Sequence, residues 1–388
     1  MSIHVDQHDG GAVIPFDAVR RWVFDEALPW WASEGVEPGF GFVERMTVAG
    51  RADPAVPFKR VRVQARQLYV FSHAATLGWS PAEAAAENGW RFLKEHGVRA
   101  DGGFARTLGR TGGVLDPELD LYDLAFVLFA LGWYHRASGD PEPLRLAEAA
   151  WTAAERGLGR PDGRGFRAAG DAGWEGQQNP HMHLLEATLG LYEATGEDRW
   201  AEEARRLGRL FAETLFDPAT GTLAEHYDAD WRRVAPVLVE PGHHFEWAWL
   251  LRRLKELTGD DHLAAARELF AFGEARGVDP ADGLVWDVVT DRGAVVKPTH
   301  RLWAPAELLK ARLARAEFEG QVDRPGITLA ARNLLDFYVR PAPSGCWCDQ
   351  LDENGRWTDD KVPASSLYHL FLSFSELLRL QPLLEERG

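Results

Sequence analysis

The amino-acid sequence predicts an all-α protein whose helices close into an (α/α)6 barrel of six inner and six outer helices. Apolar helical segments alternate with charged amphipathic segments along the chain, with a period of about 60 residues, which is typical of repeat architectures. A helix that is hydrophobic on most sides must be buried, so the apolar segments should form the inner ring. An open array would need polar caps at both ends, and the sequence shows none, which favours closure.

The outer helices are expected where charged and apolar residues share one helical pattern. The first carries Trp and Leu at helical spacing, the second begins at Ser80-Pro81 with an Ala/Glu-rich run, and later ones follow turns such as T-G-E-D and T-G-D-D. Proline and short Gly-Asp turns are common at helix starts and stops. The expected outer helices cover residues 16–32, 80–96, 142–157, a charged segment to about 216, a segment to about 276, and 328–339.

The inner helices are expected where apolar residues dominate almost every position. The first is nearly apolar beyond Arg66, the fourth starts after the chain break at Pro241-Gly242, and the last follows a serine that can cap a helix. The last inner helix should pair with the first outer helix, which closes the ring. The expected inner helices cover residues 61–75, 119–137, 179–194, a segment from 243, a segment from 302, and 365–380.

Short glycine-bounded segments with alternating Trp, Asp and Arg precede the inner helices. Such segments are typical of hairpins, so each should lie on one rim of the barrel and lead into an inner helix. The six segments are G-F-G-F-V-E-R-M, G-G-F-A-R-T-L-G-R-T-G-G, G-F-R-A-A-G-D-A-G-W, G-T-L-A-E-H-Y-D-A-D-W, G-L-V-W-D-V-V-T-D-R-G and S-G-C-W-C-D-Q-L-D-E-N-G-R-W.

The length alone allows one or two domains, but the predicted barrel makes residues 1–388 a single domain, and the composition is compatible with a small neutral ligand. The net charge of -16 argues against nucleic acid or an anionic membrane as partner, while 16 Trp residues suggest aromatic-lined cavities. Cys346 and Cys348 are too close in sequence to staple distant elements, and the N-terminus lacks a signal-peptide pattern, so we expect a cytoplasmic protein. No segment reaches the length of a membrane span. A monomer and a homodimer are both compatible with the sequence.

Polar residues interrupt the inner helices at equivalent positions. Arg66, Tyr122, His183, His243, Trp303 and His369 are 56, 61, 60, 60 and 66 residues apart, each near the start of an inner helix. In a closed barrel these positions converge on one axis at the hairpin end. A pocket with a few converging polar groups and aromatic walls is the expected ligand site.

Each member of this set also has a structural interpretation. Asn179 or His181 could cap a helix, Tyr122 and Trp303 could be core aromatics, and Glu246 in a first turn could complement the helix dipole. Arg66 is costly in an apolar helix unless it is paired or faces a ligand. Asp120, Asp123 and Glu307 are weaker candidates.

The sequence predicts neither a metal nor another cofactor. His181 with His183, and His243 with His244, offer imidazoles, but adjacent helical residues point about 100° apart, so His243 and His244 would not share an ion easily. H-E-x-x-H and Cys-x-x-Cys motifs are absent. The Gly-rich G-R-T-G-G segment lacks the Lys-Ser/Thr ending of a phosphate loop.

Histidines that face one another across an apolar pocket suit proton transfer at carbon, because their pKa lies near working pH. The chemistry this predicts is removal of a proton alpha to a carbonyl, with Arg66 stabilising the enediolate oxygen. A glycosidase would instead need two carboxylates, for which Glu246 and Asp349 are candidates, but the histidines would then have no task.

The sequence resembles the N-acylglucosamine 2-epimerase superfamily over nearly its whole length, through Q-A-R-Q-L-Y-V-F-S, Q-N-P-H-M-H-L-L-E-A, P-G-H-H-F-E-W and S-L-Y-H-L. The resemblance implies an (α/α)6 barrel, metal-independent sugar chemistry, and His243 and His369 as the acid/base residues. It also implies roles in sugar binding, ring opening or histidine support for Arg66, Tyr122, Asn179, His183, Glu246 and Trp303.

The same resemblance suggests the substrate. The P-A-S-S-L-Y-H segment is most similar to bacterial mannose isomerases, and Ser365 and Ser366 depart from the versions found in relatives that use sulfosugars or acylamino sugars. It therefore implies interconversion of D-mannose and D-fructose, and possible use of sugars such as D-lyxose. Epimerisation at C2 is the alternative; a sugar-binding protein without turnover, or an (α/α)6 hydrolase or lyase, is a more distant one.

Overall fold

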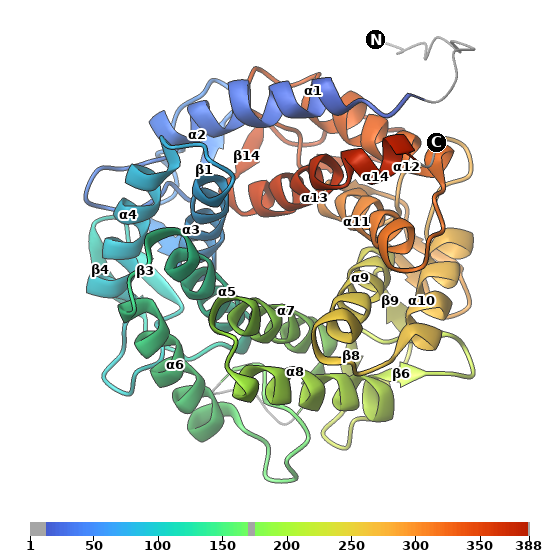
Figure 1. The fold of residues 1–388 in the computed structure, drawn as a ribbon, viewed down its shortest axis with the longest axis horizontal. Helices are drawn as coiled ribbons and strands as arrows, with labels where there is room; N and C mark the ends of the chain where they lie inside the picture. Colours follow the sequence, from blue (N-terminus) through green and yellow to red (C-terminus); the bar gives the residue numbers. More distant parts are fainter. Residues whose placement is uncertain (1–12, 170–174, 387–388) are drawn as a thin grey trace.

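The computed structural model describes residues 13–169 and 175–386, and its helices form two concentric rings (Figure 1). This arrangement confirms the predicted (α/α)6 barrel. The inner helices are α3 (Val61–Thr76), α5 (Leu121–Ser138), α7 (Gln178–Thr195), α9 (Pro241–Thr258), α11 (Trp303–Phe318) and α13 (Leu367–Arg379).

The outer ring contains α-helices that in several places continue into a π-helical turn. Its members are α1 (Phe16–Arg21) with η1 (Trp22–Ala27) and α2 (Leu28–Ser33), α4 (Ala82–Phe92) with η2 (Leu93–Gly97), α6 (Glu142–Leu158), α8 (Asp198–Leu210) with η3 (Phe211–Leu215), α10 (Leu263–Arg276), and α12 (Arg324–Asn333) with η4 (Leu334–Val339). Each inner helix packs against the outer helix that follows it in sequence, except α13, which packs against α1. The last inner helix thus pairs with the first outer helix, as predicted.

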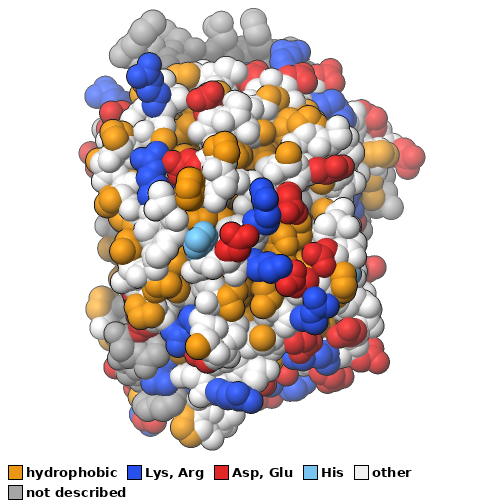
Figure 2. Space-filling view, turned by 90° about the vertical axis from the view of Figure 1, so that its left-hand side faces the viewer, with side chains coloured by type: hydrophobic (Ala, Val, Ile, Leu, Met, Phe, Trp, Pro, Cys, Tyr) orange, Lys and Arg blue, Asp and Glu red, His pale blue; other side chains and the backbone are white. Residues whose placement is uncertain are grey.

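Burial patterns explain which helices lie inside. In α5 every residue from Leu121 to Leu131 is buried except Tyr122, so no face of this helix is left for water. In α8 the buried residues recur at helical spacing, beginning with Trp200, Ala201 and Ala204, and the opposite face is charged. Figure 2 shows the side of the ring that carries α4, where basic and acidic side chains are intermixed.

Three inner helices end at a glycine in the left-handed conformation. Gly139, Gly196 and Gly259 follow α5, α7 and α9 with φ of 72°, 69° and 77°. Glycine adopts this conformation without the steric cost that a Cβ would bring. The chain therefore turns sharply at these points and enters the next outer helix.

Short strands lie at the ends of the inner helices where those helices begin. They are β1 (Arg45–Thr47), β2 (Phe58–Arg60), β3 (Thr107–Gly109), β4 (Gly112–Asp116), β5 (Gly176–Gln177), β6 (Phe216–Asp217), β7 (Thr222–Leu223), β8 (His226–Tyr227), β9 (Leu238–Val239), β10 (Val288–Thr290), β11 (Val295–Lys297), β12 (His300–Arg301), β13 (Gln350–Leu351) and β14 (Lys361–Pro363). The pairs β3-β4, β6-β7 and β10-β11 are local antiparallel hairpins.

The other strand pairs differ from the prediction of a separate hairpin in each unit. The pairs β2-β3, β5-β8, β9-β10, β12-β13 and β1-β14 join strands that precede neighbouring inner helices. The remaining two units are joined, within the described part of the chain, by a bridge between Asp120 and Ala169. The rim is therefore a belt that ties each repeat to the next. Of the segment expected at residues 165–174, the last five residues lie outside the described residues.

Helix boundaries depart from the sequence prediction by a few residues. Helix α9 begins at Pro241 and not at His243, because proline is accepted in a first turn. Helix α12 begins at Arg324, four residues before the predicted start, where the Asp323 side chain accepts a hydrogen bond from the Gly326 backbone. Two elements were not predicted: a short 3-10 turn, η5 (Ala364–Ser366), and a final helix, α14 (Gln381–Glu386).

Within residues 13–169 and 175–386, no helix has both the length and the hydropathy needed to span a lipid bilayer.

Candidate active site

A cavity of about 240 Å³ opens at the rim end of the barrel, where the inner helices begin. All six inner helices contribute to its wall. The eight residues predicted from the sequence line it together: Arg66, Tyr122, Asn179, His183, His243, Glu246, Trp303 and His369. The structure adds Glu240, Arg301, Asp349, Ser365 and Ser366 to the lining.

His243 is held by a glutamate from the rim. Its Nδ1 donates a hydrogen bond of 2.9 Å to Glu225, since a carboxylate can only accept. Glu225 in turn accepts hydrogen bonds from the Gln178 side chain (2.8 Å) and the Glu240 backbone (2.9 Å). Burial acts to lower the pKa of His243, but the Glu225 carboxylate outweighs it and raises that pKa above its ordinary value of 6.5.

His369 has the same kind of partner but the opposite electrostatic environment. Its Nδ1 donates to Glu307 over 2.8 Å, and the Lys310 ammonium lies 2.7 Å from the other oxygen of Glu307. Burial, together with the positive charges of Arg66 and Lys310, holds the pKa of His369 well below 6.5. Because Lys310 balances the charge of Glu307, His369 is neutral at working pH.

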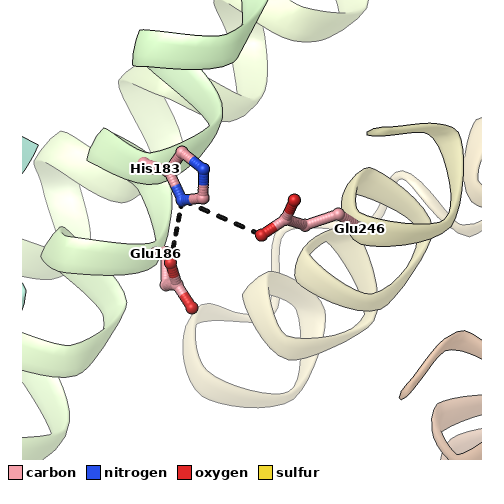
Figure 3. Close-up of side chains that lie close together, drawn as sticks. All are labelled: His183, Glu186 and Glu246. Carbon is pink, nitrogen blue, oxygen red and sulfur yellow. Dashed lines mark hydrogen bonds and ion pairs between the residues drawn. The ribbon is translucent and has the colours of Figure 1, made fainter. Parts of the chain in front are cut away.

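His183 repeats the arrangement a third time. Its Nδ1 donates to Glu186 over 3.1 Å and lies 3.8 Å from Glu246 (Figure 3). Burial lowers the pKa of His183 to about 4. In all three histidines a glutamate binds Nδ1, which leaves Nε2 as the nitrogen available to a ligand in the cavity.

Arg66 crosses the cavity wall without a carboxylate partner among the described residues. Its guanidinium donates to the Tyr122 hydroxyl over 2.7 Å and to the Ser365 carbonyl over 3.4 Å, and it lies 4.0 Å from the centre of the Phe126 ring. Its buried Nε makes no hydrogen bond within the described part of the chain. A buried cation in this state can stabilise negative charge on a ligand.

Trp303 lies between His243 and His369. Its ring centre is 4.7 Å from that of His243 and 5.9 Å from that of His369. An aromatic ring in this place contacts both imidazoles and gives the cavity an apolar surface. The sequence left Trp303 open as a core residue or a site residue, and the structure places it in the cavity wall.

Besides Glu307, which binds His369, four other candidate residues of the sequence analysis lie outside this cavity. His181 accepts a hydrogen bond from the Phe166 backbone and the His244 ring packs edge-on against Phe272, so both support the wall. Asp120 caps α5, and Asp123 forms an ion pair with Arg62. These contacts give all four residues structural tasks.

Sequence reasoning missed Glu225, Glu186 and Lys310. Glu225 lies in the rim 18 residues before His243, and no periodicity marks it. Glu186 could have been found from the sequence, because His183-x-x-Glu186 has the same spacing as His243-x-x-Glu246 in the following repeat. Lys310 follows Glu307 by three residues on one helical face, and that spacing also predicts contact.

Among the residues that the structure describes, two overlapping groups have ligand atoms within 4.8 Å of one another, a spacing that a metal ion could bridge: His183, Glu186 and Glu246, and Glu246, Glu307 and His369. Their hydrogen bonds do not suit this use. The Nδ1 atoms of His183 and His369 carry protons that are donated to glutamates, so each of these histidines could bind an ion only through Nε2. The second group also contains the Lys310 ammonium, which supplies positive charge there.

A second cavity, about 370 Å³, lies at the opposite ends of the inner helices. Its charged residues are largely paired with one another: Arg253 with Glu193, and Arg379 with Glu376 and Glu317. Cations near helix C-termini also complement the helix dipole. Because the three cavity histidines lie at the rim, we assign the chemistry to the rim cavity.

Comparisons with known proteins show which family the chain resembles. The model of the N-acylglucosamine 2-epimerase (GlcNAc 2-epimerase) family matches residues 41–373. The chain is 34% identical over 383 residues to a mannose-6-phosphate isomerase of Rhizobium meliloti (strain 1021), covering 92% of this chain and 95% of that protein. It is 32% identical over 395 residues to a D-mannose isomerase of Thermobifida fusca, covering 89% of this chain and 93% of the relative.

The fold has close counterparts among solved structures. A crystal structure of D-mannose isomerase superposes with a TM-score of 0.84, covering 94% of this chain and 97% of the other at 21% identity. At that identity the match shows the shared barrel alone.

Proposed function

The chain belongs to the N-acylglucosamine 2-epimerase family and is a sugar isomerase or epimerase, and we propose that it interconverts free D-mannose and D-fructose. In this proposal His369 moves the proton at carbon and His243 moves protons at oxygen. The observation that carries the proposal is the difference between the partners of these two histidines, which lie on either side of Trp303. His243 is bound by the Glu225 carboxylate, whereas His369 is bound by Glu307, whose charge Lys310 balances. Titratable groups whose pKa values are driven apart identify the base and the acid of a reaction.

The proposed reaction begins with the open-chain aldose. Neutral His369 takes the C2 proton through Nε2, and the electron pair moves towards the carbonyl to form a cis-enediolate whose oxygen faces Arg66. The His243 imidazolium protonates O1, and its neutral form then accepts the proton from O2. Return of the carbon-derived proton to C1 gives the ketose and restores both histidines.

Epimerisation at C2 is the second candidate and uses the same groups. Inversion needs a donor on the opposite face of the enediolate, and His243 is available across Trp303 for that purpose. The two relatives reported above are named as isomerases, and this favours proton return to C1.

The cavity lining favours a neutral sugar over a sugar phosphate. Glu240 and Asp349 line the cavity, and Arg301 is engaged by Glu240 and Asp287. A phosphate dianion would meet these two acidic groups, and Arg66 is the one lining cation without a carboxylate partner among the described residues. We therefore place unphosphorylated mannose ahead of mannose 6-phosphate.

A panel of sugars tests the substrate assignment. The purified protein is incubated with mannose, fructose, glucose, lyxose, N-acetylmannosamine, cellobiose and mannose 6-phosphate, and the products are identified by NMR. We expect mannose and fructose to interconvert and mannose 6-phosphate to react far more slowly. Glucose as the main product from mannose would select the epimerase, and preferential use of mannose 6-phosphate would overturn the neutral-sugar assignment.

Removal of metal ions is expected to leave the activity unchanged, because the proposed acid, base and enediolate-stabilising groups are all side chains. The measurement compares kcat/KM for mannose before and after exhaustive dialysis against a chelator. A large loss that added divalent ions restore would contradict the prediction and point to the carboxylate groups near His183 and His369.

The pH profile should depend on Glu225. The lowered pKa of His369 places the acidic limb below 6.5, and the raised pKa of His243 places the alkaline limb above 6.5. In Glu225→Gln the carboxylate that raises the pKa of His243 is lost while burial remains, so the alkaline limb should move to lower pH. The matched control is Glu268→Gln, an exposed carboxylate on α10, and an unmoved limb in Glu225→Gln would remove His243 as the acid.

A further inference from the structure

Three carboxyl groups and one ammonium lie together below the rim cavity. Glu186, Glu246, Glu307 and Lys310 are 3%, 1%, 0% and 0% exposed. The Lys310 ammonium lies 2.7 Å from Glu307 and 4.0 Å from the centre of the Trp249 ring. Charges buried to this degree are stable only when they are paired and hydrogen-bonded.

The hydrogen-bond donors around this cluster serve two of the three carboxyl groups. Glu186 accepts from His183 and from the Tyr368 hydroxyl, and Glu307 accepts from His369 and pairs with Lys310. Neither oxygen of Glu246 has a hydrogen-bond partner among the described residues. The nearby Nδ1 of His183, at 3.8 Å, is already bound to Glu186, so Glu246 lacks the donors that a buried carboxylate needs.

The charges that face the cluster also disfavour a negative charge on Glu246. The groups are Glu246 on α9, Arg66 on α3, His183 and Glu186 on α7, Glu307 and Lys310 on α11, and Tyr368 and His369 on α13. The two histidines are neutral, which leaves two cations for three carboxyl groups. Burial and the nearby Glu307 raise the pKa of Glu246 well above its ordinary value. Burial also acts to raise the pKa of Glu186, but the hydrogen bond from His183 outweighs it and that pKa is lowered.

We propose that Lys310 is a positioning residue that keeps one proton in this cluster, on Glu246, so that Glu246 faces the sugar as an undissociated carboxylic acid. Glu246 lines the rim cavity, and its two oxygens are free for a ligand. As a neutral acid it offers an O–H donor to one sugar hydroxyl and a carbonyl acceptor to another. That the ligand is a sugar rests on the proposed function; the protonation of the cluster does not.

The neutral state also serves the proposed reaction. A Glu246 carboxylate beside the cavity would oppose the negative charge that develops on the enediolate. With Glu246 protonated, the charge that the enediolate meets is that of Arg66. Lys310 supports this state because it satisfies Glu307, which would otherwise need a proton of its own and could no longer accept from His369 as a carboxylate.

Infrared spectra of the sugar-free protein at neutral pH, with the spectrum of each variant subtracted from that of the wild type, test the proposal. We expect the wild type to show the carbonyl stretch of one buried protonated carboxyl group, and Glu246→Gln to lose it. Glu376→Gln, which removes a carboxylate paired with Arg379 outside the cluster, serves as the matched control and should leave the band unchanged. A wild type without this band, or a band that survives in Glu246→Gln, would overturn the assignment.

The role of Lys310 is tested by Lys310→Met and Lys310→Gln. Loss of the ammonium leaves two carboxylates, Glu186 and Glu307, facing one cation, Arg66. A second carboxyl group should then take up a proton, and the intensity of the carbonyl band should about double. The glutamine variant retains a hydrogen-bond donor near Glu307, and doubling in both variants therefore reports the charge and not the packing. An unchanged band in a folded Lys310 variant would reject the role of Lys310. Because these spectra need no turnover, an inactive protein with the expected bands would reject the proposed function alone.

Discussion

Replacing His369 by asparagine is expected to lower kcat/KM for mannose by roughly 10²- to 10⁴-fold, the usual contribution of a general base. Asparagine can still donate a hydrogen bond to Glu307, but it lacks the Nε2 lone pair that takes the carbon proton. The measurement is the initial rate of fructose formation, together with proton exchange at carbon in D2O. Both should fall together if His369 is the base.

The matched control for this variant is His244→Asn. His244 is also a buried histidine with a lowered pKa, about 4 because of burial, but it packs between α9 and the outer ring and does not line the cavity. Its replacement should reduce thermal stability and leave kcat almost unchanged. Comparable kinetic losses in both variants would indicate that the effect of His369→Asn is structural.

Replacing Arg66 by methionine should reduce kcat by roughly 10²- to 10³-fold, which is typical when a group that stabilises a developing oxyanion is removed. The enediolate carries charge that the bound sugar lacks, so kcat should fall more than KM rises. The guanidinium also fixes the Tyr122 hydroxyl at 2.7 Å, and some loss of sugar affinity is expected. Steady-state kinetics with mannose and with fructose measure both effects.

An exposed arginine supplies the comparison for Arg66→Met. Arg91 on α4 has a side chain that is 59% exposed and contacts Glu87, so Arg91→Met should have wild-type kinetics. A rise in KM with unchanged kcat for Arg66→Met would mean that Arg66 binds the sugar equally well in the ground state and the transition state, and it would remove Arg66 from enediolate stabilisation.

The repeat register was enough to predict the fold and six of the eight predicted lining residues, and the family resemblance supplied the other two, Asn179 and Glu246. Residues at equivalent positions of the repeated inner helices lie at a similar depth in the barrel. The regular spacing therefore predicted that six residues converge on one cavity: Arg66, Tyr122, His183, His243, Trp303 and His369. The same register separated His243 from His244, because neighbouring helical positions face different layers of the barrel. The six register positions follow from the periodicity of the repeats.

The partners of the histidines were less accessible from sequence. Glu225 comes from the rim, where chain direction is set by strands that pair between units, such as β5 with β8. Such pairing depends on which units are neighbours in space, and a local hairpin signal does not report it. Glu307 was named only as a weak candidate, since its value depends on contact with His369, 62 residues away. The opposite pKa shifts of His243 and His369 follow from these contacts.

The central claim, that this barrel transfers a proton at carbon between C1 and C2 of a sugar, is tested most directly by NMR of mannose turnover in D2O. The account predicts fructose as the product, with carbon-bound deuterium at C1 to the extent that the proton on His369 exchanges with solvent before its return, and with deuterium in recovered mannose at C2. Fructose formation with no carbon-bound deuterium in either sugar, even after prolonged equilibration, would contradict the account.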